Sequence, residues 1–118
     1  MSIQYDSYRK EQTMYIQIVN FNLKDVSQED FAKLCEETAS DFAALPGLIS
    51  KVYLADAESN TYGGVYTWQD RQAMEDFTKT SLFEFVATHP NLENIASKDF
   101  GILEEPTRVT RGLAEVAV

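Results

Sequence analysis

Runs of apolar and β-branched residues at strand spacing alternate along this chain with stretches in which apolar residues recur at helical spacing. The four predicted strands are Met14–Leu23, Leu48–Ala55, Tyr62–Trp68 and Ile95–Leu103. The first helix is predicted to begin at a Ser27 cap, to carry apolar residues on one face and to end at Pro46-Gly47. A second helical region starts after Gln69-Asp70, is interrupted at Thr78–Ser81 and ends before Pro90, as two short helices or one bent helix.

The order of these elements is β-α-β, a hairpin, and β-α-β, which is the split βαβ or ferredoxin-like arrangement. Glu58-Ser59-Asn60 is the expected hairpin turn, and the two crossovers, Leu23 to Leu48 and Trp68 to Ile95, are nearly equal in length. Right-handed crossovers place both helical regions on one face of the sheet. We therefore predict an α+β fold, βαββαβ, with a four-stranded antiparallel sheet in a single domain over residues 13–118. Residues 1–12 are expected to be a polar leader, and the residues from about 104 a C-terminal tail.

The second face of the predicted sheet has no helix to cover it, although the strands are apolar on both sides. In the first strand, Ile16 and Ile18 point one way while Val19 and Phe21 point the other. An apolar sheet face of this size needs a partner. The simplest partner is a second copy of the chain, so we predict a homodimer that packs sheet face against sheet face, a dimeric α+β barrel.

The third strand combines large rings with glycine. Alternation places Tyr62, Gly64, Tyr66 and Trp68 on one face, so a glycine gap lies among three rings. Glycine inside a strand often marks the close approach of a ligand or of another backbone. The face is therefore either the wall of a ligand cavity or ordinary core packing, since aromatic side chains commonly pack the core. The choice depends on whether this face meets the helices or the partner subunit.

Composition argues against several classes of function. The net charge of −9 disfavours binding to nucleic acid and to anionic membranes, both of which attract basic proteins. No apolar run approaches the length of a membrane span, and the N-terminus lacks the pattern of a signal peptide. Cys35 is the only cysteine, so no internal disulfide can form, which fits a cytoplasmic protein. With one cysteine and one histidine, a metal site built from nitrogen and sulfur ligands is not expected.

Three segments together resemble the YdhR-type family of proteins named as monooxygenases, in the dimeric α+β barrel superfamily. The segments are residues 46–53 (PGLISKVY), residues 62–66 (YGGVY), and Glu104-Glu105-Pro106 near Arg108. The resemblance covers roughly Met14 to Arg111. It implies a homodimer with a pocket between sheet and helices. It also implies an activity similar to that of antibiotic-biosynthesis monooxygenases, which oxidise polycyclic aromatic substrates with O₂ and no cofactor.

A cofactor-free oxygenase requires a substrate that can itself pass an electron to O₂, because oxygen chemistry otherwise relies on a metal, haem or flavin. The chain has no GxGxxG or P-loop motif, and we predict no cofactor. The protein would supply a dry apolar pocket, a base and hydrogen-bond donors. We expect Trp68, Tyr66 and Asn20 to be the catalytic donors that position the substrate and stabilise its anion. The substrate-binding residues are expected to be Tyr62, Tyr53, Gly64 and Phe77.

The other ionisable residues are weaker candidates. His89 precedes Pro90 at the predicted end of a helix, where the dipole favours imidazolium, so we expect a cap or surface role. Asp99 is expected on the face toward the partner subunit, as an ion-pair partner or a base. Cys35 lies on the apolar stripe of the first helix and is expected to be a buried, inert thiol. The tail arginines either pair with nearby carboxylates or clamp an acidic ligand; the residues concerned are Arg108, Arg111, Glu104 and Glu105.

Two functions from different classes remain open. The first is a cofactor-independent monooxygenase acting on a small phenol-like or quinol-like aromatic. The alternative is a dimer that binds or senses a small apolar ligand without turnover. The feature that would favour the enzyme is a base able to work in the pocket, and the sequence shows no convincing one.

Overall fold

The computed structural model describes residues 14–113, so the predicted leader, residues 1–12, lies outside the described part. Four antiparallel strands form one sheet in the order β2-β3-β1-β4. The strands are β1 (Tyr15–Leu23), β2 (Leu48–Asp56), β3 (Thr61–Trp68) and β4 (Leu92–Gly101). The helices are α2 (Gln28–Ala43), α3 (Arg71–Phe77), α4 (Ser81–Thr88) and α5 (Glu104–Val109). This is the predicted α+β, ferredoxin-like arrangement.

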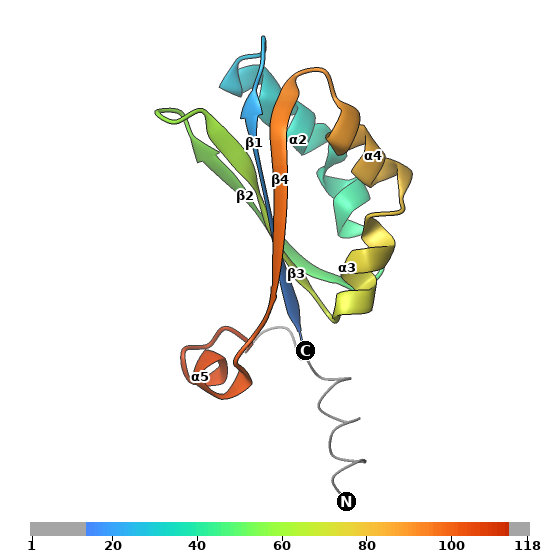
Figure 1. The fold of residues 1–118 in the computed structure, drawn as a ribbon, viewed down its shortest axis with the longest axis vertical. Helices are drawn as coiled ribbons and strands as arrows, with labels where there is room; N and C mark the ends of the chain where they lie inside the picture. The colour runs from blue at the N-terminus through green and yellow to red at the C-terminus, as the bar shows by residue number, and fades with distance from the viewer. Residues whose placement is uncertain (1–13, 114–118) are drawn as a thin grey trace, which may run out of the picture.

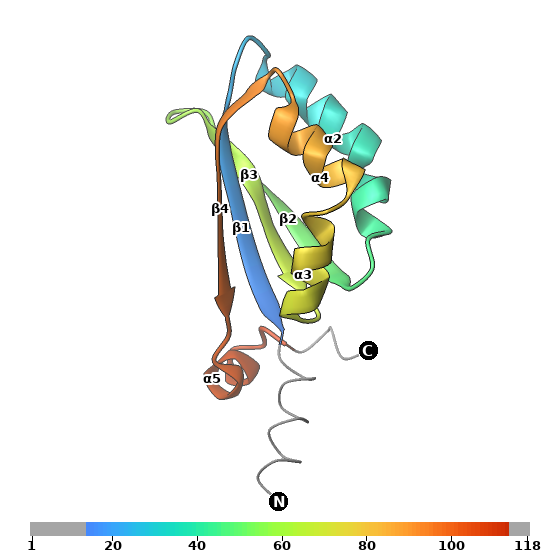
Figure 2. The same ribbon diagram turned by 45° about the vertical axis from the view of Figure 1, so that its right-hand side comes forward.

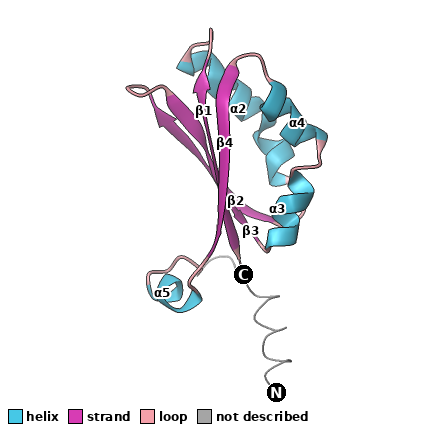
Figure 3. Cartoon of the chain, viewed as in Figure 1, coloured by secondary structure: helices cyan, strands magenta, loops and turns pink. Residues whose placement is uncertain are grey.

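Figures 1 and 2 show that α2, α3 and α4 lie together on one face of the sheet. The opposite face carries no helix along its length, as Figure 3 also shows. On that open face Val52 and Phe100 are 57% and 48% exposed. No helix among residues 14–113 is long and apolar enough to cross a membrane.

Capping residues explain where the helices begin. The Ser27 side chain accepts a hydrogen bond from the Asp30 backbone N–H, so α2 starts where the sequence predicts. The interruption at Thr78–Ser81 contains the N-cap of a second helix. The Thr80 hydroxyl accepts a hydrogen bond from the Phe83 backbone N–H, so α4 begins there. The second helical region is therefore two helices, α3 and α4.

Strands β1, β2 and β3 match the prediction to within one residue, whereas β4 and the tail differ more. Strand β4 begins at Leu92 and ends at Gly101, so it lies earlier in the chain than the predicted Ile95–Leu103. Its start contains Asn94 with φ of +57°, a conformation typical of turns, and its pairing with β1 shifts register between Asn20 and Asn22. The predicted tail contains a short helix, α5, which lies beyond the end of the sheet on the side away from the other helices (Figures 1 and 2).

The core lies between the sheet and the three helices. Strand β3 turns Tyr62, Tyr66 and Trp68 toward the helices, where these side chains are 3%, 3% and 0% exposed. Phe42 from α2 and Phe77 from α3 pack against the Tyr66 ring. The rings of β3 therefore face the helices and leave the open sheet face to smaller side chains such as Val65 and Thr67.

Candidate functional site

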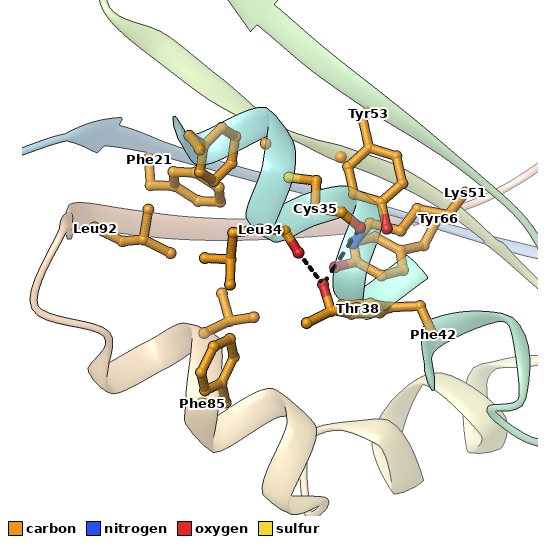
Figure 4. A pocket seen from close by; sticks show the side chains of 14 residues that line it. Phe21, Leu34, Cys35, Thr38, Phe42, Lys51, Tyr53, Tyr66, Phe85 and Leu92 are labelled. Atoms are coloured by element: carbon orange, nitrogen blue, oxygen red, sulfur yellow. Dashed lines mark hydrogen bonds between the residues drawn. The ribbon is translucent and has the colours of Figure 1, made fainter. Parts of the chain in front are cut away.

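A small cavity lies between the sheet and helices α2 and α4. Its volume is about 40 Å³, enough for one or two water molecules. Aromatic and aliphatic side chains form most of the wall, and Figure 4 shows Lys51, Tyr53 and Tyr66 gathered at one end. The lining residues are Phe21, Phe31, Leu34, Cys35, Thr38, Phe42, Lys51, Tyr53, Gly63, Gly64, Tyr66, Phe85, Val86 and Leu92.

A groove lies beside the cavity, between α2 and the edge strand β2. Its volume is about 270 Å³, and its wall is mostly apolar. Phe31, Cys35 and Tyr53 line both hollows. The Tyr53 ring therefore lies between the cavity and the groove. The Tyr53 side chain is partly open to solvent, since the residue is 39% exposed. The groove is lined by Gln28, Phe31, Ala32, Cys35, Glu36, Ala39, Tyr53, Leu54, Ala55 and Tyr62.

Among residues 14–113, Lys51 on β2 is the only cationic side chain in the cavity wall. Its Nζ lies 3.3 Å from the centre of the Phe42 ring, 4.1 Å from that of Tyr53 and 4.8 Å from that of Tyr66. Rings at these distances attract an ammonium through the negative potential of their faces. No carboxylate of residues 14–113 lies within ion-pair distance of this amine.

Gly64 makes room for this lysine. A Cβ at position 64 would lie 2.9 Å from Cε of Lys51, closer than atoms pack. Tyr53 pairs with Gly64 and Lys51 pairs with Tyr66 across the two strands, so the lysine stem passes over the glycine. The neighbouring Gly63 has a different role: its φ is +153°, and a Cβ there would lie 1.8 Å from the carbonyl oxygen of Val19 on β1. The glycine gap among the rings of β3 is thus filled by Lys51.

Burial sets the protonation of the groups in the cavity. It lowers the pKa of Lys51 from 10.5 to about 8, because the ammonium loses much of its hydration. The same loss of hydration raises the pKa of Tyr66 and, less strongly, that of Tyr53, so both stay neutral hydrogen-bond donors at neutral pH. Burial also raises the pKa of Cys35, which keeps it a thiol.

Three of the seven predicted site residues line the cavity: Tyr66, Tyr53 and Gly64. Tyr62 lines only the groove, and its hydroxyl donates a hydrogen bond of 2.7 Å to Oε1 of Gln28. Tyr66 lies in the cavity wall beside Lys51, as Figure 4 shows.

Trp68 and Phe77 lie in the core and do not line the cavity, contrary to expectation. The Trp68 indole stacks on Tyr66 with ring centres 5.9 Å apart, and its Nε1 donates to Oε1 of Gln17 at 3.0 Å. Phe77 packs against both rings, with its centre 5.2 Å from that of Trp68. The indole N–H is therefore already satisfied by the protein, which removes the donor role that the sequence suggests.

Asn20 also lies away from the cavity. It sits on β1 between Val19 and Phe21, which both point to the helices, so its side chain points to the open sheet face. There its Nδ2 donates a long hydrogen bond of 3.5 Å to the Tyr62 carbonyl. The alternation of β1 and the direction of the adjacent residues account for this placement.

The weaker candidates have structural roles. Asp99 lies opposite Gln17, hence on the helix side of β4 and not on the open face as expected, and it accepts a 2.7 Å hydrogen bond from the Tyr15 hydroxyl. His89 is the C-cap of α4, as expected. Arg108 lies 3.8 Å from a carboxylate oxygen of Glu104, one turn away, which confirms a pairing in the tail.

Lys51 is the residue that the sequence analysis missed. A lysine between Ser50 and Val52 is typical of a solvent-facing strand position. The available signal is the hairpin register: a turn at residues 57–60 aligns Lys51 with Tyr66, whose ring faces inward. Among residues 14–113 no group of three or more His, Cys, Asp or Glu side chains could hold a metal ion.

The fold and the cavity define a class: α+β proteins with a ferredoxin-like sheet whose helices cover an apolar cavity. A sequence model of the family described as "Putative mono-oxygenase ydhR" matches residues 16–113, and the chain belongs to this family. The match confirms the resemblance carried by residues 46–53, 62–66 and 104–106. No protein of curated function matches the sequence significantly.

Solved structures share the fold at low sequence identity. SnoaB from Streptomyces nogalater, a cofactor-independent oxygenase, is 17% identical with a TM-score of 0.63, covering 78% of this chain and 95% of SnoaB. Hydroxynitrile lyase from Passiflora edulis is also 17% identical, with a TM-score of 0.62, covering 79% of this chain and 96% of the lyase. A conserved protein from Bacteroides thetaiotaomicron, described as a "possible oxidoreductase", is 16% identical with a TM-score of 0.62. The match covers 77% of this chain and 99% of that protein. An oxygenase and a lyase share this fold, so the choice of chemistry rests on the residues of the cavity.

Proposed function

We propose that this protein is a cofactor-independent monooxygenase that oxidises a small phenol or quinol in the cavity between sheet and helices. The observation that carries the proposal is the aromatic cavity with a partly buried amine, Lys51, and the phenol ring of Tyr66 at the same end. Membership of the ydhR family and the fold shared with an oxygenase support the same reaction class.

The volumes suggest how an aromatic substrate is held. Ligand sites usually measure about 300–1,000 Å³, so the 40 Å³ cavity alone is too small for a bicyclic ring. The adjacent groove of 270 Å³ supplies the missing space. The substrate ring would lie partly in the groove and displace the Tyr53 ring, which separates the two hollows. Its hydroxyl would then reach the end of the cavity where Lys51 and Tyr66 lie.

The reaction balances without a cofactor if the substrate is the electron donor. With 1-naphthol, loss of the hydroxyl proton gives the naphtholate, which passes one electron to O₂. The two radicals combine at the ring carbon opposite the oxygen, and the peroxide takes up a proton. Loss of water, with the hydrogen of that ring carbon, then gives 1,4-naphthoquinone. One atom of O₂ enters the ring and the other leaves as water.

Oxygen uptake tests the proposal directly. Wild-type protein is expected to consume O₂ with 1-naphthol or with other small phenols that have an open para position, at a rate proportional to protein concentration. Tyr66→Phe removes only the hydroxyl and is expected to lower kcat about 10- to 100-fold, since a donor to a developing anion is lost. The matched control, Lys33→Met on the exposed side of α2, is expected to retain the wild-type rate.

The alternative is a binding protein without turnover. Trp68 stacks on Tyr66, so ligand in the cavity is expected to change the fluorescence of this single tryptophan. Fluorescence titration with 1-naphthol without any oxygen uptake would favour the binding protein and contradict the oxygenase.

We further propose that the working form is a homodimer joined through the open sheet face. That face exposes Val52 and Phe100, and helix α5 lies beyond the end of the sheet on the same side (Figures 1 and 2). Leu103, which precedes α5, and Val109, which ends it, are 77% and 78% exposed. A second copy of the chain would bury these side chains, which supports an isologous contact.

A further inference from the structure

Lys51 lies where its amine has lost much of its hydration and has no carboxylate partner among residues 14–113. Its stem runs over Gly64, and its Nζ ends among the rings of Phe42, Tyr53 and Tyr66, at 3.3, 4.1 and 4.8 Å from the ring centres. These rings attract the ammonium form but give it no countercharge. Lys51 therefore differs from a typical surface lysine, whose ammonium is hydrated or paired with a carboxylate.

The groups that face this amine come from each element packed around it. They are Cys35 from α2, Tyr53 from β2 itself and Tyr66 from β3, all of which are neutral near pH 7 because burial raises their pKa values. Helix α4 contributes Phe85 and Val86, which carry no charge. An anion that enters the cavity would therefore be the first negative charge that Lys51 meets.

We propose that Nζ of Lys51 accepts the hydroxyl proton of a bound phenol and remains beside the phenolate as its counter-cation. The substrate class is thus an aromatic with a weakly acidic hydroxyl. In this step the substrate O–H bond breaks and an N–H bond forms with the lone pair of the amine. Only a proton is transferred, so neither the substrate nor the lysine is oxidised. The role in oxidation rests on the proposed function, whereas the proton transfer on binding does not.

The protonation of Lys51 suits this transfer. Burial lowers its pKa to about 8, so the ammonium predominates at pH 7 and the free base predominates above pH 8, close to the range that general bases require. The ammonium and phenolate attract strongly in an apolar cavity, which stabilises the ionised pair relative to water. After O₂ addition, the ammonium returns its proton to the ring peroxide, which regenerates the free amine. The ring hydroperoxide then loses water.

The test uses 2-naphthol, whose anion absorbs at longer wavelength than its neutral form and than the protein. The probe is added to wild-type protein, anaerobically, at a pH at which free 2-naphthol is neutral. Binding is expected to produce the naphtholate band in wild-type protein and in the Lys33→Met control. The Lys51→Met variant is expected to bind the probe in its neutral form, with the naphtholate band reduced at least tenfold.

Proton release, measured by calorimetry in buffers of different ionisation enthalpy, separates a base from a fixed charge. Below pH 8 the ammonium is already present, so wild-type protein is expected to release about one proton for each probe bound. Above pH 8 the amine captures that proton, and the release falls toward zero. Lys51→Arg keeps the charge but cannot titrate in this range, so its release is expected to stay near one proton throughout.

Some outcomes would overturn the proposal. A naphtholate band that is absent from wild-type protein, or equally strong in Lys51→Met, would show that Lys51 is not the base. So would proton release that does not change as pH passes 8. These readouts do not depend on turnover. A clear naphtholate band without oxygen uptake would support the role of Lys51 as base and contradict the oxygenase. Oxygen uptake that is the same in wild-type protein and in Lys51→Met would support the oxygenase and contradict the role of Lys51.

Discussion

Gly63 and Gly64 are adjacent in β3, yet they make room for different neighbours. Gly63 allows the backbone of β1 to approach, because a Cβ would lie 1.8 Å from the Val19 carbonyl oxygen. Gly64 allows the Lys51 side chain to cross β3, because a Cβ would lie 2.9 Å from its Cε. The first contact is with rigid backbone, and the second is with the far end of a flexible side chain. Gly63 is therefore expected to matter for stability, and Gly64 for the position of Lys51.

Alanine substitution is expected to affect the two positions in opposite ways. Gly63→Ala strains the backbone and is expected to cost about 3 kcal/mol or more in the free energy of unfolding. Gly64→Ala is expected to change the free energy of unfolding by less than about 1 kcal/mol, since only the lysine must move. It is nevertheless expected to reduce oxygen uptake at least tenfold. Urea denaturation and oxygen uptake measure the two effects, and a fully active Gly64→Ala variant would contradict the placement of Lys51.

The lowered pKa of Lys51 also predicts a dependence of stability on pH. Between pH 8 and pH 10.5 the folded protein loses the Lys51 proton while the unfolded chain keeps it. The unfolded state then binds more protons, so this residue makes the free energy of unfolding rise with pH across that window. Below pH 8 both states are protonated and the contribution is constant.

The comparison with Lys51→Met isolates this contribution. Tyr66 and Tyr53 have raised pKa values, so they act in the opposite direction as pH passes their ordinary value of 10.0. They are present in both proteins and largely cancel in the difference. Wild-type protein is expected to gain stability relative to Lys51→Met from pH 8 to pH 10.5 in thermal or urea denaturation. A difference that stays constant over this range would mean that the lysine has an ordinary pKa.

The residue scale is also where the sequence was least informative. Tyr66, Tyr53 and Gly64 line the cavity, in the direction that strand alternation gives them, and their roles in catalysis and binding stay predictions. Trp68 faces the same way, but its indole N–H donates a hydrogen bond to Gln17 on another strand. Strand alternation alone does not reveal this partner. Lys51 is missed because its direction depends on the hairpin register and on the space above Gly64.

At the scale of elements, Gln17 joins three strands. On β1, its Oε1 accepts from the Trp68 indole of β3 at 3.0 Å, and its Nε2 donates to Oγ of Ser97 on β4 at 3.1 Å. Gln17 is 1% exposed, so neither bond can be replaced by bulk water on the Gln17 side.

Gln17→Leu is expected to cost about 1–3 kcal/mol in the free energy of unfolding, because the indole N–H is left buried without an acceptor. Ser97→Ala is the matched control: Ser97 is exposed, so its loss is expected to cost less than about 1 kcal/mol. Urea denaturation measures both variants. Equal costs would show that burial of the indole N–H is not what makes Gln17 important.

The regular elements were predictable because each has a local cause. Ser27 and Asp70 cap α2 and α3, and the turn before Thr61 closes the β2–β3 hairpin. Helix α5 was not predicted, because it is six residues long and shows no apolar periodicity, although a proline in the first turn is compatible with a helix. The early start of β4 was missed because its Asn94 is typical of a turn.

At the scale of the whole molecule, the open sheet face defines the expected assembly. The near-equal crossovers were enough to predict the topology and the bare face, since both follow from chain order and handedness. The size of the cavity could not be predicted, because it depends on how the Lys51 and Tyr53 side chains fill the space under α2. The sheet face and the cavity lie on opposite sides of the sheet, so the proposed assembly and the proposed catalysis can be tested by separate substitutions.

A charge on the open face is expected to dissociate the proposed dimer. Phe100 is 48% exposed on β4, so Phe100→Glu is expected to leave the fold intact while placing a carboxylate in the interface. Sedimentation at micromolar concentration is expected to show a dimer for wild-type protein and a monomer for Phe100→Glu. Ser81→Glu, at the exposed start of α4 on the helix side, is the control and is expected to remain a dimer. A monomeric wild-type protein would contradict the proposed assembly.

The most direct test of the proposed oxygenase is the fate of the oxygen atoms. Wild-type protein is incubated with 1-naphthol under ¹⁸O₂, and the quinone is analysed by mass spectrometry. The expected product is 1,4-naphthoquinone with one ¹⁸O atom, formed at least tenfold faster than with Lys51→Met. Quinone without the label, or labelled quinone formed no faster than in the absence of protein, would contradict the proposed oxygenase.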